Sequence, residues 1–348
     1  MALLTTLGVG GPARYLVEAR TADDVRQAVY EAQSKGWPLF VLGGGSNLVV
    51  SDAGWPGMVL KIAITGIDQR REDDKEIFEV GAGEEWDSFV GVAVRQNCAG
   101  VECLSGIPGT VGGTPVQNVG AYGQEVSETI QSVQTLDLTT GHTYEFCKEA
   151  CEFAYRESLF NTRAKGRYII LRVTFGLQHG GEPKLDYADL RRYFADRTDR
   201  PTLQDTRQAV RNIRQQKAML IVQGDEDCRS AGSFFKNPIV TPHEYERLAD
   251  QAAYHGLQMP HFGTPQGVKV PAAWLVEHSG FQKGYQRGPV AISRRHALAI
   301  VNRGGATAAD VIALKNEIQQ RVRDHWDIQL HPEPVFVGFE SAGLIAAE

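Results

Sequence analysis

Hydrophobic and polar positions along the chain follow helical spacing in some stretches and form short apolar runs in others. Three helices are predicted, each from the same local pattern. A Thr is followed three positions later by an acidic residue, and apolar residues at helical spacing come next. In this capping box the two side chains satisfy backbone N–H groups that a helix start leaves free. The three begin at Thr21, Thr202 and Thr241, and the first and third should end near Gly36 and Gly256.

Other helices are indicated by apolar spacing alone. Residues 84–96 are amphipathic, and residues 307–326 carry an apolar stripe that starts at Val311. Residues 272–278 also favour a helix, whereas residues 185–194 favour either a short, charged helix or a loop.

Strands are predicted where short apolar runs end in turn residues. We expect a turn over residues 52–57, a hairpin turn at Gly141 and an extended segment at residues 328–337. The predicted strands are residues 37–42, 48–50, 58–62, 77–80, 130–138, 143–146 and 168–177.

Composition is that of an ordinary globular protein, with 348 residues, 42% of them hydrophobic and 22% charged. This length allows two or three domains. The net charge of −6 gives no reason to expect nucleic acid or an anionic membrane as a partner. No apolar run reaches the length of a membrane span, and the first residues lack a basic signal-peptide start. We therefore expect a soluble protein without membrane insertion.

The five cysteines are an odd number, which disfavours a complete disulfide framework. Cys147 and Cys151 lie four residues apart, but no further Cys or His completes a metal-binding pattern. Free thiols in a cytoplasmic protein are expected, with no metal site.

Residues 106–125, here called the glycine-rich segment, contain six glycines, two prolines and a single charge. Such a run does not form a stable helix interior, and it is too apolar for a solvated linker. One interpretation is a ligand-binding loop whose glycines let the backbone approach a flat or phosphorylated ligand. The other is a cluster of tight turns in a sheet protein.

A second glycine loop, residues 43–47, follows a predicted strand. It invites comparison with the dinucleotide-binding fingerprint, but Leu48 occupies the third glycine position and a strand follows instead of a helix. A Rossmann site is therefore disfavoured. Backbone amides that bind a pyrophosphate and a plain hairpin turn both remain open.

Together, several segments resemble the UDP-N-acetylenolpyruvoylglucosamine reductases. The resemblance spans nearly the whole chain in order, and its most distinctive parts are Gln-Asn-Val-Gly-Ala-Tyr-Gly at 117–123 and Gly-Ser-Phe-Phe-Lys-Asn-Pro at 232–238. The matching segments are residues 41–48, 106–113, 117–123, 153–158, 231–238 and 331–334.

This resemblance implies an α+β protein with the FAD-binding fold of the vanillyl-alcohol-oxidase (PCMH) type, not a Rossmann fold. It implies two subdomains that hold FAD between them, residues 1–66 and 67–220, and an α+β substrate-binding domain at residues 221–322. Residues 323–348 would return to the FAD-binding part and the active site.

The implied reaction is that of an oxidoreductase in peptidoglycan synthesis. NADPH, as co-substrate, reduces noncovalently bound FAD, which then reduces UDP-N-acetylglucosamine enolpyruvate to UDP-N-acetylmuramate. We expect a cytoplasmic monomer.

The family pattern implies three catalytic residues. The alkene must receive a hydride and a proton, with negative charge developing beside a carboxylate. Arg156 and Glu333 would stabilise the enolate, and Ser233 would donate the proton. Without the family, Arg156 is typical of a surface salt bridge, Glu333 of a solvated acid between two prolines, and Ser233 of a loop serine.

Binding residues follow from the same pattern. Tyr187 falls where one class of these reductases carries a mobile tyrosine loop, within the long stretch 178–201. For substrate, the implied residues are Tyr187, Lys217, Asn237 and Gln286. For FAD, they are Gly43, Gly44, Gly45, Ser46, Asn47, Gly106, Ile107, Pro108, Gly109, Gly113, Thr114, Asn118, Gly120, Ala121, Tyr122 and Gly123.

The predicted helix that starts at Thr202 also carries Arg207, Arg211, Arg214 and Lys217 at roughly helical spacing. Such a basic stripe is typical of a solvated helix face, which is our expectation for all of it except Lys217.

Two alternative functions remain open. A flavin oxidase of the same fold often attaches its flavin through His or Cys in the glycine loops, which contain neither, although Cys103 lies just outside. The other alternative is a nonenzymatic nucleotide-sugar-binding protein, which the joint presence of Arg156, Ser233 and Glu333 disfavours.

Overall fold

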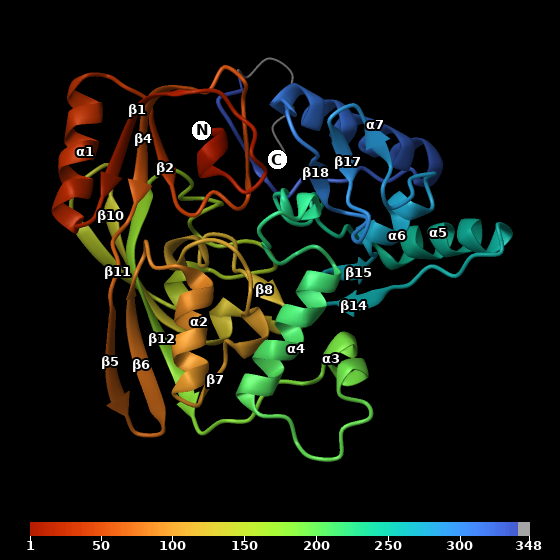
Figure 1. Cartoon of the computed structure of the whole chain (residues 1–348), viewed down its shortest axis with the longest axis horizontal. Coiled ribbons are helices and arrows are strands. Elements are labelled where there is room, and N and C mark those ends of the chain that lie inside the picture. The colour runs from red at the N-terminus through yellow and green to blue at the C-terminus, as the bar shows by residue number, and fades with distance from the viewer. Residues whose placement is uncertain (340–348) are drawn as a thin grey trace. The chain divides into compact units, whose positions relative to one another are not determined.

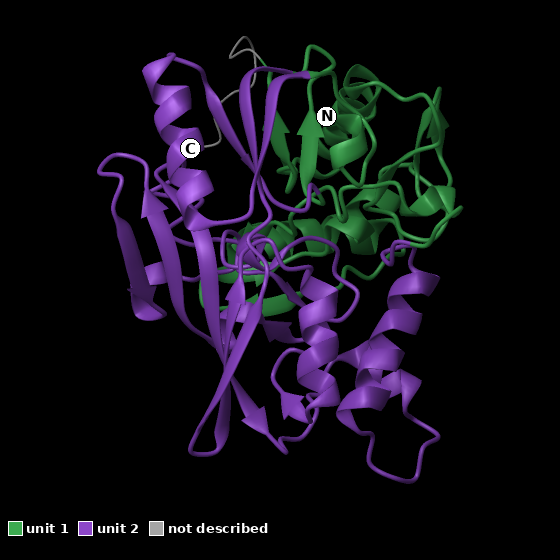
Figure 2. Ribbon diagram, turned by 60° about the vertical axis from the view of Figure 1, so that its left-hand side comes forward, with its two compact units in different colours: residues 1–12, 46–54, 222–348 green, residues 13–45, 55–221 purple. Residues whose placement is uncertain are grey.

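The computed structural model describes residues 1–339 and divides into two compact units (Figure 2). Unit 2 comprises residues 13–45 and 55–221, and unit 1 comprises residues 1–12, 46–54 and 222 onward. The second glycine loop is therefore divided, with Gly45 in unit 2 and Ser46 in unit 1. The finer division into two FAD-binding subdomains, a substrate domain and a C-terminal segment stays a prediction, and residues 340–348 of that segment lie outside the described residues.

Unit 2 begins with a three-stranded parallel sheet in the order β1-β4-β2 (Figure 1). Its strands are β1 (Ala13–Ala19), β2 (Leu39–Leu42) and β4 (Trp55–Ile62). Helix α1 (Ala22–Ser34) covers one face, and its predicted capping box is present, with Thr21 and Asp24 each satisfying the other's backbone N–H. The buried Val25, Ala28, Val29 and Ala32 supply the packing surface, as the helical spacing predicts.

The larger sheet of unit 2 is antiparallel, in the order β11-β10-β12-β6-β5, with β7 paired to β12. Its central strand β12 (Tyr168–His179) pairs with β10 (Ile130–Asp137) on one side and β6 (Lys75–Gly81) on the other. The remaining strands are β5 (Ile67–Glu72), β7 (Cys98–Ala99) and β11 (Thr143–Cys147).

Helix α2 (Trp86–Arg95) packs against this sheet through buried aromatic rings. Phe89 lies 4.9 Å from Phe175 and 5.7 Å from Phe78 between ring centroids. Helix α4 (Leu203–Gln216), with its predicted capping box at Thr202, contacts α2, and the short α3 (Ala188–Tyr193) contacts α4 in turn. The two longer helices thus lie beside the glycine-rich segment, which contains η3 (Val111–Gly113) and the hairpin β8 (Gly120–Ala121) and β9 (Gln124–Glu125).

Unit 1 has its own core, formed by three helices and short sheets. Strand β3 (Leu48–Val50) pairs in parallel with β19 (Val335–Val337), which joins the segment 46–54 to the late part of this unit's sequence. Two antiparallel sheets have the orders β13-β15-β14 and β16-β17-β18. The remaining elements are α5 (Pro242–Tyr254), α6 (Ala272–Glu277), α7 (Ala308–Trp326), β13 (Ile239–Val240), β14 (Phe262–Thr264), β15 (Gly267–Lys269), β16 (Gln286–Arg287), β17 (Val290–Ile292) and β18 (Ile300–Asn302).

The capping-box predictions are confirmed at all three helices, and α5 has Pro242 in its first turn and ends just before Gly256, whose φ is +70°. The open alternative at residues 185–194 resolves as the helix α3. The predicted turn over residues 52–57 was too long, because β4 already begins at Trp55 and pairs there with β1. Strands β1 and β5 were not predicted, and neither were the short strands β7–β9 and β13–β18.

Candidate active site

The two glycine loops contact each other inside unit 2. A Cβ on Gly44 would lie 2.5 Å from the Cα of Gly109, and one on Gly43 would lie 2.9 Å from the hydroxyl oxygen of Thr110. Backbones approach this closely only where no side chain intervenes. The loops predicted to serve one ligand are therefore adjacent, and glycine is required at Gly44 for that contact.

Thr110, which the sequence interpretation missed, lies at the centre of this contact. Its hydroxyl oxygen is buried, and within the described part of the chain it has no hydrogen-bond partner. Buried hydroxyls are normally hydrogen-bonded, so one without a partner beside two glycine loops indicates that a ligand group completes the site. A Thr directly after a glycine of such a segment is the signal that could have identified it.

The glycine-rich segment turns back at Tyr122 and Gly123, whose φ angles are +48° and +84°. Two successive residues with positive φ suit the tight turn between β8 and β9. This backbone is unfavourable for Tyr122 by about 1–2 kcal/mol. Contacts to the ring hold it there, because it packs edge-on against Tyr187 and lies 5.9 Å from the Lys217 ammonium. Burial raises the pKa of Tyr122 to about 12.

Arg156 is joined to the same hairpin. Its guanidinium Nη2 donates to the carbonyl oxygen of Gly120 at 2.9 Å, and the side chain is half-buried. Arg156 itself has a φ of +59°, stabilised by Asn161, whose amide donates to the Arg156 carbonyl. The structure thus places this predicted catalytic cation against the predicted cofactor loop.

Asn118 has a structural role that was not predicted from the sequence. It is buried, and its amide nitrogen donates to Glu125 Oε2 at 2.8 Å and to the carbonyl of Ala154 at 3.0 Å. Its amide oxygen accepts the N–H of Ser127. The side chain therefore ties the hairpin to the Arg156 loop.

Two predicted substrate residues lie next to Tyr122. Tyr187, the N-cap residue of α3, places its ring 5.4 Å from that of Tyr122, and the Lys217 ammonium lies 5.9 Å from the Tyr122 centroid. Lys217 Nζ also lies 2.5 Å from Asp189 Oδ2. Tyr122, Tyr187 and Lys217, which come from three separate stretches of sequence, thus form one cluster in unit 2.

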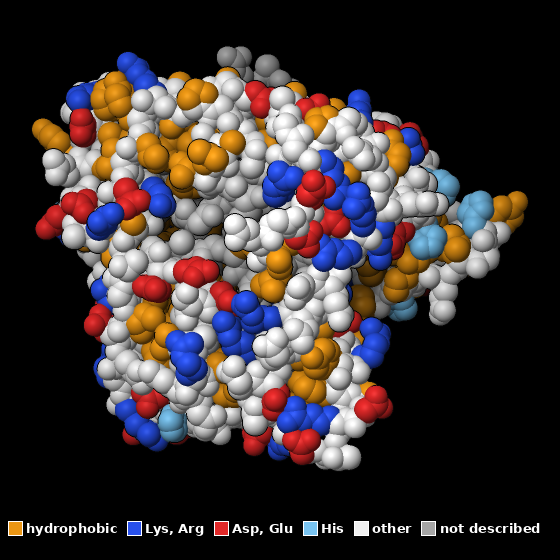
Figure 3. Space-filling model, in the orientation of Figure 1, with side chains coloured by type: hydrophobic (Ala, Val, Ile, Leu, Met, Phe, Trp, Pro, Cys, Tyr) orange, Lys and Arg blue, Asp and Glu red, His pale blue; other side chains and the backbone are white. Residues whose placement is uncertain are grey.

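The prediction of a solvated basic stripe on α4 was wrong. Arg214 is buried, and its Nε donates to the Gly106 carbonyl at 3.1 Å while Nη2 donates to the Met219 carbonyl. Arg207 and Arg211 both pair with Asp87 of α2. These arginines face α2 and the glycine-rich segment instead of water. Asp87 and backbone carbonyls accept the hydrogen bonds that water would accept on a solvated helix face. Figure 3 shows basic side chains gathered over α2 and α4.

In unit 1, Ser233 and Glu333 lie on two neighbouring segments. The N–H of Glu333 donates to the carbonyl of Phe234, next to Ser233, at 3.0 Å. Asn47 joins the same place, since its amide nitrogen donates to the Glu333 carbonyl at 3.3 Å. Ser233 and Glu333 are both half-buried. The structure brings these three predicted residues together within the unit.

The other predicted residues of unit 1 are engaged in local structure. Asn237 accepts the first helical N–H of α6, from Ala272, at 2.9 Å. Gln286 is exposed on β16 and donates to the Gly288 carbonyl. The carbonyl of Ser46 accepts from the hydroxyl of Thr6.

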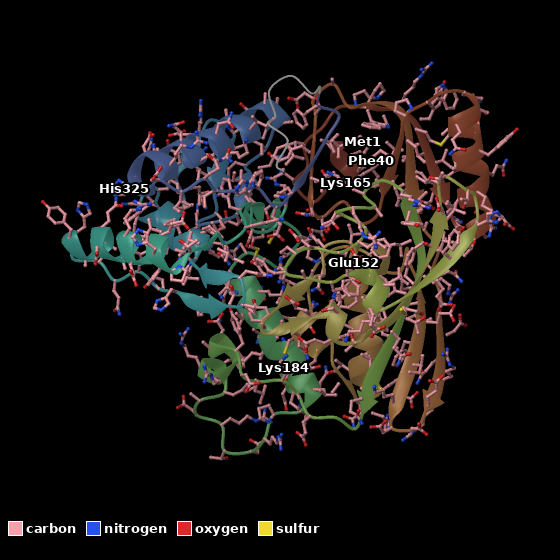
Figure 4. All side chains as sticks on the ribbon, turned by 180° about the vertical axis from the view of Figure 1, so that it is seen from behind. Met1, Phe40, Glu152, Lys165, Lys184 and His325 are labelled. Atoms are coloured by element: carbon pink, nitrogen blue, oxygen red, sulfur yellow. The ribbon has the colours of Figure 1, made fainter. Side chains whose placement is uncertain are left out.

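Cys103, the cysteine just before the glycine-rich segment, is held by local contacts. Cys103 is buried, and its thiol donates to the carbonyl of Lys184, which is labelled in Figure 4. Burial and the carboxylate of Glu102 raise the pKa of the Cys103 thiol, so a reactive thiolate is disfavoured. Within residues 1–339, no group of three or more His, Cys, Asp or Glu side chains is arranged to hold a metal ion. In that same range, no helix combines the length and apolar character that a membrane span requires.

Comparison with known proteins identifies the family. A model of the "FAD binding domain" matches residues 13–146, and a model of the "UDP-N-acetylenolpyruvoylglucosamine reductase, C-terminal domain" matches residues 223–337. The UDP-N-acetylenolpyruvoylglucosamine reductase of Thermobifida fusca is 43% identical over 341 residues, which cover 96% of this chain and 95% of that protein. The chain belongs to the UDP-N-acetylenolpyruvoylglucosamine reductase family.

Further relatives agree with this assignment. The reductase of Streptomyces coelicolor is 43% identical over 345 residues, covering 97% of this chain and 89% of the relative. The crystal structure of the reductase from Thermus caldophilus is similar with a TM-score of 0.64 and 27% identity, over 97% of this chain and 96% of that one. The predicted resemblance to this reductase family and the predicted α+β fold with an FAD-binding domain are thus confirmed.

Proposed function

We propose that this protein is an oxidoreductase that uses NADPH and FAD to reduce UDP-N-acetylglucosamine enolpyruvate to UDP-N-acetylmuramate, a precursor of peptidoglycan. Two findings support the proposal: the chain belongs to the reductase family, and its two glycine loops contact each other in unit 2. The contact between the loops carries the argument, because it forms a backbone surface that a flat, phosphorylated cofactor can approach closely.

The residues of this surface fit FAD. Thr110 offers a buried hydroxyl that lacks a protein partner in the described residues, and the glycines at 43, 44 and 109 carry no side chain that would hold a flat ligand away from the backbone. We propose that the segments 43–47 and 106–123 hold the cofactor without a covalent bond. When bound, FAD would take a hydride from NADPH and supply it to the substrate alkene.

The chain's own residues would then handle charge and the proton. A guanidinium can hold a carboxylate with two parallel N–H groups, so we assign Arg156 to the negative charge that develops beside the enolpyruvyl carboxylate. Glu333 is assigned to the same stabilisation of the enol form. Ser233 donates the proton in this proposal, since positioning can offset the low acidity of a hydroxyl.

Substrate binding is assigned to Lys217, Tyr187, Asn237 and Gln286. Lys217 supplies a cation for the diphosphate, and its place in a cluster with Tyr187 supports a shared role in binding the nucleotide part. Asn237 and Gln286 are assigned as hydrogen-bonding groups. We further propose that the protein acts in the cytoplasm, where its nucleotide-sugar substrate and NADPH are found, and that it acts as a monomer.

An anaerobic experiment tests the function directly. The protein, loaded with FAD, is reduced with NADPH while the flavin absorbance is followed, and UDP-N-acetylglucosamine enolpyruvate is then added. We expect prompt reoxidation of the flavin together with formation of UDP-N-acetylmuramate. Flavin that stays reduced after the addition would refute the proposal.

A second measurement addresses the oxidase alternative. Acid precipitation separates a noncovalent flavin from the protein, whereas a covalently attached flavin precipitates with it. We expect all of the yellow colour in the supernatant. Colour retained in the pellet would favour the oxidase.

A further inference from the structure

Asp87, in the first turn of α2, is the common partner of three groups around the glycine-rich segment. Its Oδ1 accepts the backbone N–H of Gly106 at 2.6 Å and the Arg207 Nη1 at 2.6 Å. Its Oδ2 accepts from the Arg211 Nη1, and its carbonyl oxygen accepts from Arg207 Nη2. The side chain is only 18% exposed. A carboxylate with this many charged and backbone donors is held in a single orientation.

Gly106, where the glycine-rich segment begins, is held from both sides. Its N–H donates to Asp87, and its carbonyl accepts from the buried Arg214 of α4. Its φ is +72°, in the left-handed region, and a Cβ would lie 2.8 Å from Leu220 Cδ1, so the position favours glycine. Asp87 and Arg214 therefore determine the direction in which the chain enters the segment.

The same helix end holds the segment further along. The N–H of Trp86 donates to the Gly109 carbonyl at 3.1 Å, and the N–H of Val111 donates to the Glu84 carbonyl at 2.9 Å. Gly109 and Thr110 are the residues that contact the other glycine loop. The first turn of α2 thus anchors the segment at Gly106 through a side chain and beyond it through the backbone.

We infer that Asp87 is a positioning residue for FAD binding: by holding the Gly106 N–H and the two arginines of α4, it keeps the glycine-rich segment in its ligand-binding conformation. This inference rests on the proposed function, since it assumes that the segment binds FAD. The electrostatics agree with it. Burial works to raise the pKa of the Asp87 carboxyl, but hydrogen bonds from Arg207 and Gly106 hold that pKa below its usual value, so the carboxylate stays ionised at neutral pH.

The test uses FAD affinity of the apoprotein, measured by quenching of flavin fluorescence. Asp87→Asn and Asp87→Ala are compared with the matched control Asp137→Asn. Asp137 is likewise a buried carboxylate, paired with Arg167 in the same unit, but it lies on β10 and accepts no bond from the glycine-rich segment. We expect the Kd for FAD to rise about tenfold to a hundredfold in both Asp87 variants and to stay within about twofold in the control.

Two further readouts separate positioning from general stability. Amide hydrogen exchange at Gly106 should accelerate in Asp87→Asn and remain unchanged in Asp137→Asn, and Asp87→Glu, which keeps the charge, should recover part of the FAD affinity. If Asp87→Asn does not give folded apoprotein, Arg211→Gln replaces it and must raise the Kd. The inference is overturned if the Asp87 variants bind FAD as tightly as the wild type. It is also overturned if Asp137→Asn loses as much FAD affinity as the Asp87 variants do. Failure of the wild-type apoprotein to bind FAD would overturn the proposed function instead.

Discussion

The carboxylate of Asp189 lies 2.5 Å from the ammonium of Lys217 and joins the start of α3 to the end of α4. Tyr187, whose ring packs against Tyr122, lies two residues before Asp189. In the proposed function, Lys217 binds the substrate diphosphate. Asp189 would then be an internal anion that competes with the substrate for the same cation.

Removing that competitor should strengthen substrate binding. We expect Asp189→Asn to lower the KM for UDP-N-acetylglucosamine enolpyruvate by about twofold to fivefold at unchanged kcat, the scale of a partly exposed ion pair. Lys217→Ala should raise the same KM. Steady-state kinetics check both, with Asp199→Asn as the control, since Asp199 pairs with Arg197 away from Lys217. A higher KM for Asp189→Asn would show that the pair serves binding and not competition.

Ser233→Ala separates the two halves of the proposed reaction. Reduction of the flavin by NADPH should stay within about twofold of wild type, because no proton from Ser233 is needed there. Reoxidation by substrate should slow by about 10²–10⁴-fold, the usual contribution of a positioned acid. Anaerobic stopped-flow absorbance measures each half separately. Equal losses in both would argue against the proton-donor role.

Gly44→Ala tests the contact between the glycine loops. The added methyl would lie 2.5 Å from Gly109 Cα, so the loops must separate, at a cost of about 1–3 kcal/mol in stability. We expect a lower Tm and a higher Kd for FAD. Gly263→Ala is the matched control, because a Cβ there meets no atom within 4 Å and the backbone is not left-handed. Unchanged FAD affinity in Gly44→Ala would mean that the contact does not matter for the cofactor.

Asp205 makes the stability of α4 depend on pH. Hydrogen bonds from Arg197 and Thr202 lower the pKa of its carboxyl from 3.8 to about 2. Because the pKa is lower in the folded state, the stabilisation is fully present above about pH 4 and is lost as pH falls toward about 2. Asp205→Asn should therefore have a lower Tm than wild type at pH 6, and the difference should shrink between pH 4 and pH 2. Thermal unfolding followed by circular dichroism checks this, and a Tm difference independent of pH would contradict it.

The helices were predictable because their signals are local. Thr21, Thr202 and Thr241 each cap a helix through a residue only three positions away, so no distant contact is needed to define the start. Strands β1 and β5 were missed for the opposite reason. Both lie at sheet edges with mostly exposed side chains, and β5 in particular is polar except at Ile67. Only pairing with β4 and β6 makes these stretches strands.

The candidate site shows the same difference between what local sequence signals predict and what distant contacts decide. Motifs made the two glycine loops, Arg156, Ser233 and Glu333 predicted functional residues, because residue type and order identify a family. The role of α4 could not be obtained this way. A run of arginines at helical spacing has the same pattern whether it faces water or protein, and Asp87, which decides the matter, lies on a separate helix.

Local patterns and motif order were enough to predict three capped helix starts, the family and the residue types available for the proposed chemistry, since these depend on neighbours along the chain or on the order of motifs. The folded structure was needed to show that Gly44 packs on Gly109, that the Thr110 hydroxyl oxygen is buried without a hydrogen-bond partner in the described residues, and that Asp87 and Arg214 hold Gly106. Folding removes certain backbone and side-chain polar groups from water. These buried groups then need hydrogen-bond partners, which come from distant parts of the sequence.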